Sequence, residues 1–223
     1  MAWKLFKRSF KANIGHLELD PQGWTLEDDT PEKRAWSEPN GVAYLSLHYF
    51  PVTPDLPQKA DLTALREFYR NSLKGANGGL IKADWVTFNG LRCVETLIKL
   101  PQEPNGICYL ASYILPFSNC SFVLKMQAME LGITGTRESI MVERLLNDEV
   151  IEITPEGQMK NWWVDPYDPN LTDGFIMSLA EQEQYDKDFP NHHLTLLRQW
   201  MQRVGESVTL SPELAKLEPW YAA

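Results

Sequence analysis

Leu80-Ile-Lys-Ala-Asp-Trp-Val-Thr-Phe-Asn-Gly-Leu-Arg-Cys-Val-Glu-Thr-Leu-Ile-Lys99 is the stretch that decides the fold predicted for this chain of 223 residues. Asn89-Gly90 divides the stretch, and both residues tolerate the positive φ angles that a tight hairpin turn requires. The flanking segments are rich in β-branched and aromatic residues, which favour strands. We therefore expect two antiparallel strands, Leu80 to Phe88 and Leu91 to Lys99.

Further strands are expected on both sides of this hairpin. Ile107 to Leu115 is almost continuously apolar, which is typical of a central strand covered on both faces. Phe122 to Ala128 alternates between apolar and polar residues, as do the upstream runs His16 to Leu19 and Tyr44 to Phe50. Asn40-Gly41 is a second hairpin signal. Together these runs predict one antiparallel sheet of about six strands.

The clearest helix of the first half is expected at residues 61–74. Asp61 is a plausible N-cap, because its side chain can accept hydrogen bonds from the first free N–H groups of a helix. Leu62, Leu65, Phe68, Tyr69 and Leu73 form one apolar stripe at helical spacing. Gly75 is expected to end the helix in the left-handed conformation.

Three more helical segments are expected downstream. Gly132 and Gly135 lead into a helix at about 136–147. Ser178 and Glu181 match a capping box that begins a short acidic helix, on which Glu181 and Glu183 are expected to be solvated. An apolar stripe from Leu194 predicts a last helix that ends at about Ser207. The fold class expected is therefore α+β, a single antiparallel sheet packed with helices and followed by a helical C-terminal extension.

The charge of the chain is unevenly distributed. The 21 Lys and Arg residues and 30 Asp and Glu residues give a net charge of -9. Residues 151–223 hold 12 acids and 5 bases, and residues 1–150 hold 18 acids and 16 bases. We therefore expect a nearly neutral α+β domain at 1–150 and an acidic, aromatic-bearing helical extension at 151–223 packed on it. This acidity argues against a general nucleic-acid binder.

The compartment expected is the cytoplasm. The sequence has no run of about 18 apolar residues, which a membrane span requires. Residues 1–11 are basic, but no apolar segment of a secretory signal follows them. The first 11 residues are interpreted as a strand or an exposed arm, with a membrane-surface helix as the alternative. Cys93, Cys108 and Cys120 are expected to be reduced thiols.

The order of these elements resembles the PsbP-like superfamily over residues 1–147. The resemblance rests on Gly23-Trp24 after the first strand, the helix from Asp61 to Lys74, and the Asn89-Gly90 hairpin. The superfamily includes the extrinsic photosystem subunit, the Mog family that binds the Ran GTPase, and bacterial DcrB-type proteins. The resemblance implies an α/β/α sandwich that serves as a non-catalytic binding scaffold. It carries over no functional residue, and the residues from 151 onward depart from it.

Aromatic residues in the acidic extension are the first candidate for a binding site. They are Trp162, Trp163, Tyr167 and Trp220. Aromatic side chains ringed by charge are typical of the energetically dominant positions of protein interfaces. The alternative is that these rings attach the extension to the domain, since so many aromatic residues must be buried somewhere.

The loop at residues 132–139 is the second candidate. Gly135, Thr136 and Arg137 precede or open a helix, whose free N–H groups can hold a phosphate or a carboxylate. The Lys-Ser/Thr pair of a phosphate-binding loop is missing, so a turn that requires glycine is the structural alternative.

Signals for metals and for catalysis are weaker. Asp165, Asp168, Asn170 and Asp173 offer oxygen ligands for calcium, but their spacing is not that of an EF-hand. Adjacent His192 and His193 point to different faces of a helix start, so they are poorly placed to share a zinc ion. Cys120 is the most loop-like thiol, without a basic neighbour in sequence to activate it. We expect no metal and no cofactor.

The function predicted from the sequence is a non-catalytic protein-interaction module of bacterial type. Its partner would be a protein, and the acidity would accelerate association with a cationic partner. Contact is expected through a sheet edge or through the acidic aromatic extension. The alternative is a small-molecule or anion-binding protein, with a possible enzymatic role, that uses the loop at residues 132–139.

Overall fold

One antiparallel sheet of seven strands organises the protein. The computed structural model describes residues 10–57, 61–88, 90–171, 174–218 and 220. The spatial order of the strands is β2-β3-β4-β8-β7-β6-β5, so β2 and β5 are the edges. The strands are β2 (Thr25–Asp29), β3 (Lys33–Ser37), β4 (Ala43–Phe50), β5 (Gly79–Phe88), β6 (Leu91–Pro101), β7 (Ile107–Pro116) and β8 (Ser121–Met129).

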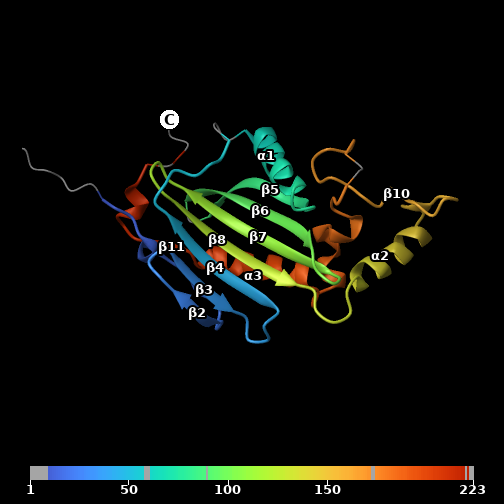
Figure 1. Ribbon diagram of the computed structural model, residues 1–223, viewed down its shortest axis with the longest axis horizontal. Helices are drawn as coiled ribbons and strands as arrows, with labels where there is room; N and C mark the ends of the chain where they lie inside the picture. Colours follow the sequence, from blue (N-terminus) through green and yellow to red (C-terminus); the bar gives the residue numbers. More distant parts are fainter. Residues whose placement is uncertain (1–9, 58–60, 89, 172–173, 219, 221–223) are drawn as a thin grey trace, which may run out of the picture.

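Two long helices lie on opposite faces of this sheet, and a third lies beyond its end (Figure 1). Helix α1 (Leu62–Lys74) packs on β5, and α3 (His193–Ser207) packs on β7 and β8. Helix α2 (Thr136–Asn147) follows β8. The shorter elements are η1 (Ile14–His16), β1 (Leu17–Glu18), β9 (Glu152–Ile153), β10 (Met159–Lys160), η3 (Leu179–Glu181), η4 (Glu183–Asp188), β11 (Thr209–Leu210) and η5 (Leu214–Lys216).

The main core lies between the sheet and α3. Side chains alternate along a strand, so every second residue of β4, β7 and β8 faces α3. Leu45, Leu47 and Leu124 are at most 1% exposed on this side. Helix α3 contributes Leu197 and Met201 to the same cluster. Burial of this apolar surface is the main reason why the last third of the chain stays on the sheet.

The opposite face is only half covered. Leu65 and Leu73 of α1 pack against residues of β5 and β6, including Val94 and Ala83. The same face of β4 carries Tyr44 and other side chains that no helix covers among the residues described. The sheet is therefore enclosed on both sides at β5 and β6 and open on one side at β4 and β8.

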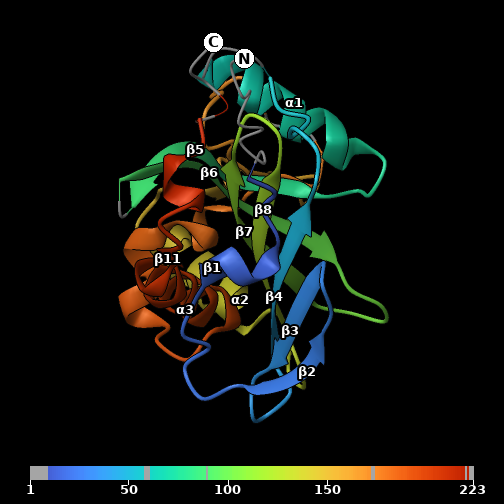
Figure 2. The same cartoon turned by 90° about the vertical axis from the view of Figure 1, so that its left-hand side faces the viewer.

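The C-terminal third crosses the β5 edge of the sheet before it forms α3 (Figure 2). The Tyr167 hydroxyl accepts a hydrogen bond from the Ala83 N–H of β5 at 2.8 Å and donates one to Asp84 at 2.9 Å. Arg70 of α1 forms an ion pair with Asp165. Part of the β5 edge is thus capped by the protein's own chain.

Most elements agree with the sequence prediction. The sheet is antiparallel and sandwiched by helices as expected, with seven strands in place of about six. Asp61 caps α1 by accepting from the N–H groups of Thr63 and Ala64. Gly75 is not left-handed, since its φ is -71°; the positive φ lies at Asn77.

Some predicted features lie outside the described residues. They are residues 1–9 of the basic N-terminal segment, and Asn89 of the hairpin turn, whose partner Gly90 has the expected positive φ of 75°. No helix in the described part of the chain is long and apolar enough to cross a membrane.

Candidate functional site

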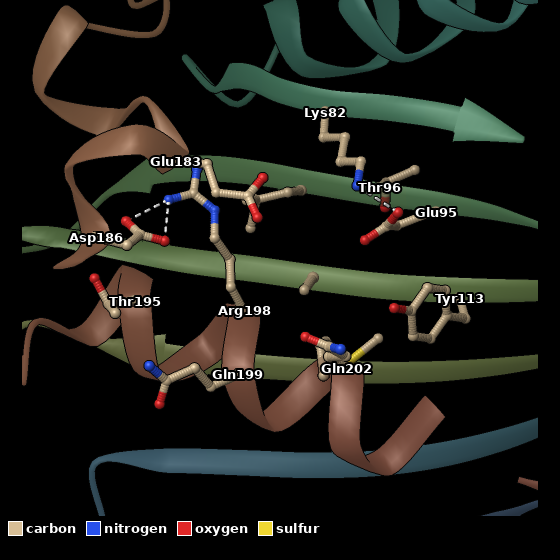
Figure 3. Close-up of a pocket in the computed structure, with 13 residues that line it drawn as sticks. Lys82, Glu95, Thr96, Tyr113, Glu183, Asp186, Thr195, Arg198, Gln199 and Gln202 are labelled. Carbon is tan, nitrogen blue, oxygen red and sulfur yellow. Dashed lines mark hydrogen bonds and ion pairs between the residues drawn. The ribbon is translucent and has the colours of Figure 1, made fainter. Parts of the chain in front are cut away.

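A pocket of about 430 Å³ opens between α3 and the strands β5, β6 and β7 (Figure 3). The last third of the chain forms one wall, through η4 and α3, and the sheet forms the other. The residues that line it are Lys82, Glu95, Thr96, Leu97, Ala111, Tyr113, Glu183, Asp186, Thr195, Arg198, Gln199, Met201 and Gln202.

Four of the charged residues of this pocket form two ion pairs. The Lys82 ammonium lies 2.6 Å from the Glu95 carboxylate across β5 and β6. Arg198 of α3 donates to both carboxylate oxygens of Asp186, at 2.8 and 3.0 Å. Asp186 also forms an ion pair with Arg137, which lies behind the pocket, so this carboxylate is shared by two arginines.

Glu183 is the remaining charged residue. It is solvent-exposed at the start of η4, and Figure 3 shows its carboxylate pointing into the pocket. No ion pair is formed by Glu183 with any residue that the structure describes. The amides of Gln199 and Gln202 line the α3 side of the pocket, and Leu97 and Met201 supply apolar surface. The lining therefore has one net negative charge, polar groups and an apolar floor.

A buried network of hydrogen bonds holds the wall of the pocket that contains Asp186. Arg137 of α2 has no exposed surface and donates to the carbonyl of Ala180 at 2.7 Å and to Asp186 at 2.8 Å. It also donates to Thr195 at 3.0 Å. Charge-assisted hydrogen bonds of this kind are about twice as strong as neutral ones. Helix α2, η4 and α3 are thus held together by one side chain behind the pocket.

The aromatic residues singled out in the extension are mostly packed inside the molecule. Trp162 is 2% exposed, in a cluster with Met141 and Leu145 of α2. Trp163 is partly buried against the same cluster, and Trp220 lies against Trp85 at 6.2 Å between ring centres. In the structure these rings attach the extension to the domain, which was the alternative considered from the sequence. A role of these rings in partner binding stays a prediction.

The loop predicted to bind an anion has the expected backbone but a different orientation of its arginine. Gly135 has a φ of 71° and precedes α2, which begins at Thr136. Arg137, however, points into the protein and is occupied by the network just described. Its partners Asp186 and Thr195 line the pocket, so this arginine supports the pocket from behind.

The residues considered for calcium serve internal contacts. Burial would raise the pKa of Asp165, but hydrogen bonds from Arg70 and from the N–H groups of Tyr167 and Asp168 outweigh this effect and lower it. Asp173 lies outside the described residues. Burial also raises the pKa of the Cys120 thiol to about 11, which disfavours a nucleophilic thiolate at neutral pH.

Sequence reasoning missed the residues that form the pocket. Lys82, Glu95 and Arg198 have no common motif, and only the packing of α3 on the sheet brings them together. The one available signal was the excess of acid after residue 150, which includes Glu183 and Asp186. Glu181, expected on a solvated face, is fully buried, because it forms an ion pair with Lys99.

A second hollow lies on the opposite face of the sheet, between α1 and β8. It has a volume of about 320 Å³ and includes Phe50, Val52, Phe68, Tyr69 and Val123 in its lining. Phe50 is 43% and Val52 is 59% exposed. This groove is apolar and carries no charge pattern comparable to that of the pocket in Figure 3.

Comparisons with known proteins show similarity of fold. No protein-family model matches the chain, and no curated protein matches it in sequence. A Mog1 point-mutant structure matches with a TM-score of 0.44 and 10% identity, over 91% of this chain and 97% of the other. The fold is similar to the Mog1 and PsbP folds, as element order suggested.

Two further structures are similar to parts of the chain. The Ran-binding protein Mog1p of Saccharomyces cerevisiae matches with a TM-score of 0.39 and 12% identity, over 60% of this chain and 85% of its own. The PsbP of Synechocystis sp. PCC 6803 matches with a TM-score of 0.37 and 13% identity, over 62% and 85%. The chain spans 42% of the length of a matched protein from Bacteroides thetaiotaomicron. These likenesses concern fold alone.

Proposed function

We propose that the protein is a non-catalytic interaction module that takes a cationic side chain of a protein partner into the pocket beneath the sheet. One observation carries the proposal: the Glu183 carboxylate points into the pocket and forms no ion pair with any residue that the structure describes. A cation is the group that this unpaired carboxylate would bind most favourably.

The remaining lining suits the long side chains of lysine or arginine. Their methylene stems are apolar while their head groups are charged and donate several hydrogen bonds. Leu97 and Met201 offer surface for the stem, and the side-chain oxygens of Gln199 and Gln202 can accept from the head group. A non-catalytic role is consistent with the pairing of Glu95 and Asp186, since both carboxylates are held by cations.

The acidity of the extension supports the same partner class. Residues 151–223 carry a charge of -7, and Glu183 and Asp186 belong to that segment. A field of this sign accelerates the approach of a positively charged partner and weakens as salt is added. The proposal thus moves the contact from the aromatic residues to the acidic residues of the extension. A cytoplasmic location stays a prediction.

A free cationic metabolite is the second candidate, because a volume of about 430 Å³ lies within the range of small-molecule pockets. Both candidates are tested by titrating the full chain with a lysine-rich decapeptide and with spermidine, at 25 and 250 mM salt. Binding of the peptide that weakens at least tenfold at high salt, with little binding of spermidine, supports the interaction module. Tighter binding of spermidine than of the peptide favours the metabolite.

The variant Glu183→Gln tests the site. We expect it to weaken peptide binding at least fivefold, because it removes the unpaired charge without changing the shape of the pocket. Glu156→Gln is the matched control, since Glu156 is an exposed acid in the β9–β10 turn. Equal losses in both variants would show that only the net charge matters and would contradict the pocket as the binding site.

A further inference from the structure

Four elements bring a separate group of polar side chains together at one end of the sheet. Glu130 directly follows β8, Glu138 lies in the first turn of α2, and His192 caps the start of α3. One ligand atom from each of these residues lies within 4.8 Å of the other two. Tyr109 of β7 adjoins them, with its ring 5.9 Å from that of His192. None of the four residues lines the pocket of Figure 3.

The Glu138 carboxylate is buried without a hydrogen bond from any other described residue. Both of its oxygens are inaccessible to solvent. The hydroxyl of Tyr109, a residue with no exposed surface, likewise has no partner in the described part of the chain. Burial raises the pKa of Tyr109, and the charge of Glu181 raises it more than those of Glu138 and Glu130 do. Buried polar groups without partners are rare in native proteins and point to an unseen ion or water.

Protonation of Glu138 would remove only part of the free-energy cost of burying these unpartnered oxygens. Burial raises the pKa of Glu138, which favours the neutral acid. A protonated carboxyl, however, carries an O–H donor that needs an acceptor, and neither Glu138 oxygen has a hydrogen-bond partner among the described residues. A bound cation would satisfy the buried oxygens and the charge together.

The cationic side chains of Arg137 and Lys99 interact with groups other than Glu138. Arg137, adjacent in sequence to Glu138, donates to Ala180, Gln182, Thr195 and Asp186. Lys99 is paired with Glu181 at 2.7 Å. Glu130 receives hydrogen bonds from the Ile107 N–H and the His192 ring, each at 3.1 Å. Thus two carboxylates and an imidazole converge without a cationic side chain of their own.

We propose that Glu130, Glu138 and His192 bind a divalent transition-metal ion of the zinc type. Two carboxylates and one imidazole form a ligand set that zinc accepts, whereas calcium and magnesium prefer oxygen alone. Three protein ligands leave an open coordination position for water. If Nε2 of His192 binds the ion, the ring proton moves to Nδ1. The 3.2 Å hydrogen bond that Nδ1 accepts from the Leu194 N–H is then lost.

The test is calorimetric titration of the untagged, chelator-treated full chain with ZnCl₂, MnCl₂ and MgCl₂. We expect one zinc ion per chain with micromolar or tighter affinity, a rise in melting temperature, and no binding of magnesium. X-ray absorption of the zinc complex is expected to show nitrogen and oxygen ligands. Sulfur ligands, which would come from the cysteines, or absence of binding at 100 µM zinc would overturn the proposal.

Matched variants locate the site. Glu138→Gln and His192→Gln are each expected to weaken zinc binding at least thirtyfold, whereas His193→Gln, which changes the neighbouring histidine, leaves it unchanged. Glu138→Gln removes an unpaired buried charge, so its metal-free melting temperature is expected to equal or exceed that of the wild type. Zinc affinity that falls in His193→Gln and not in Glu138→Gln would refute the site. Glu183→Gln should not alter zinc affinity, which separates this proposal from the binding pocket.

Discussion

Lys99 and Glu181 form the most deeply buried ion pair of the described structure. Their charged atoms are 2.7 Å apart, and the two side chains are 2% and 0% exposed. The same carboxylate oxygen accepts from the Ser178 N–H at 2.7 Å, which completes the capping box of η3. The Lys99 ammonium also lies 4.6 Å from the centre of the Phe175 ring. One β6 residue thus fixes the course of the extension before α3.

The predicted consequence is an asymmetry between single and double substitutions. Lys99→Met leaves the Glu181 carboxylate buried and unpaired, so the free energy of unfolding should fall by about 3–5 kcal/mol. The double variant Lys99→Met/Glu181→Gln removes both charges, and we expect it to recover most of that loss. Urea denaturation followed by circular dichroism measures both effects.

Lys82→Met is the control, because its pair with Glu95 is partly exposed: the lysine side chain is 38% accessible. Surface ion pairs contribute roughly 0–1 kcal/mol, so little change is expected. A similar loss for Lys82→Met and Lys99→Met would show that burial does not govern the strength of the pair.

At the scale of elements, α3 packs closely against the sheet at Gly205. A Cβ atom added at this position would lie 2.8 Å from Cε2 of Tyr113, whose ring is buried in the core. Alanine has a helix propensity about 1 kcal/mol better than glycine. Overpacking of a core, however, typically costs about 1–3 kcal/mol. Packing and propensity therefore oppose each other at Gly205.

We predict that packing prevails and that Gly205→Ala lowers the melting temperature. Gly75→Ala is the matched control, since Gly75 has a φ of -71° and open space around its Cα. This control is expected to be neutral or slightly stabilising, because alanine restricts the unfolded chain. A higher melting temperature for Gly205→Ala in thermal denaturation would mean that the helix moves away from Tyr113 at little cost.

The elements were predictable from the sequence because their signals are local. The Asp61 cap and the helix at 136–147 depend on residues within one or two turns, and the structure confirms both. The pairing of Lys99 with Glu181 spans 82 residues, and the spacing along the chain gives no sign of it. For the same reason the acids of the extension were recognised as a group, while the pocket that Glu183 enters was not.

At the scale of the whole molecule, the segment that carries most of the net charge also covers one face of the sheet. Residues 151–223 carry most of the net charge, and they also supply α3, the layer that covers one face of the sheet. The segment that could attract a cationic partner is therefore also required to bury the core. Charge-reversing variants in it are best placed at Glu183, which is exposed, and not at buried Glu181.

A chain that ends at residue 150 should consequently fail to fold into the native structure. Loss of α3 would expose Leu45, Leu47 and Leu124, which are at most 1% exposed in the full chain. Exposed apolar surface of this kind binds anilinonaphthalene dyes. Loss of the packed core also abolishes cooperative unfolding. We expect strong dye fluorescence, a weak near-UV circular dichroism signal and no sharp urea transition. Adding residues 151–223 as a separate peptide should quench the dye signal. A cooperative transition in the shortened chain alone would instead show that residues 10–150 form an independent domain and that α3 is dispensable for its core.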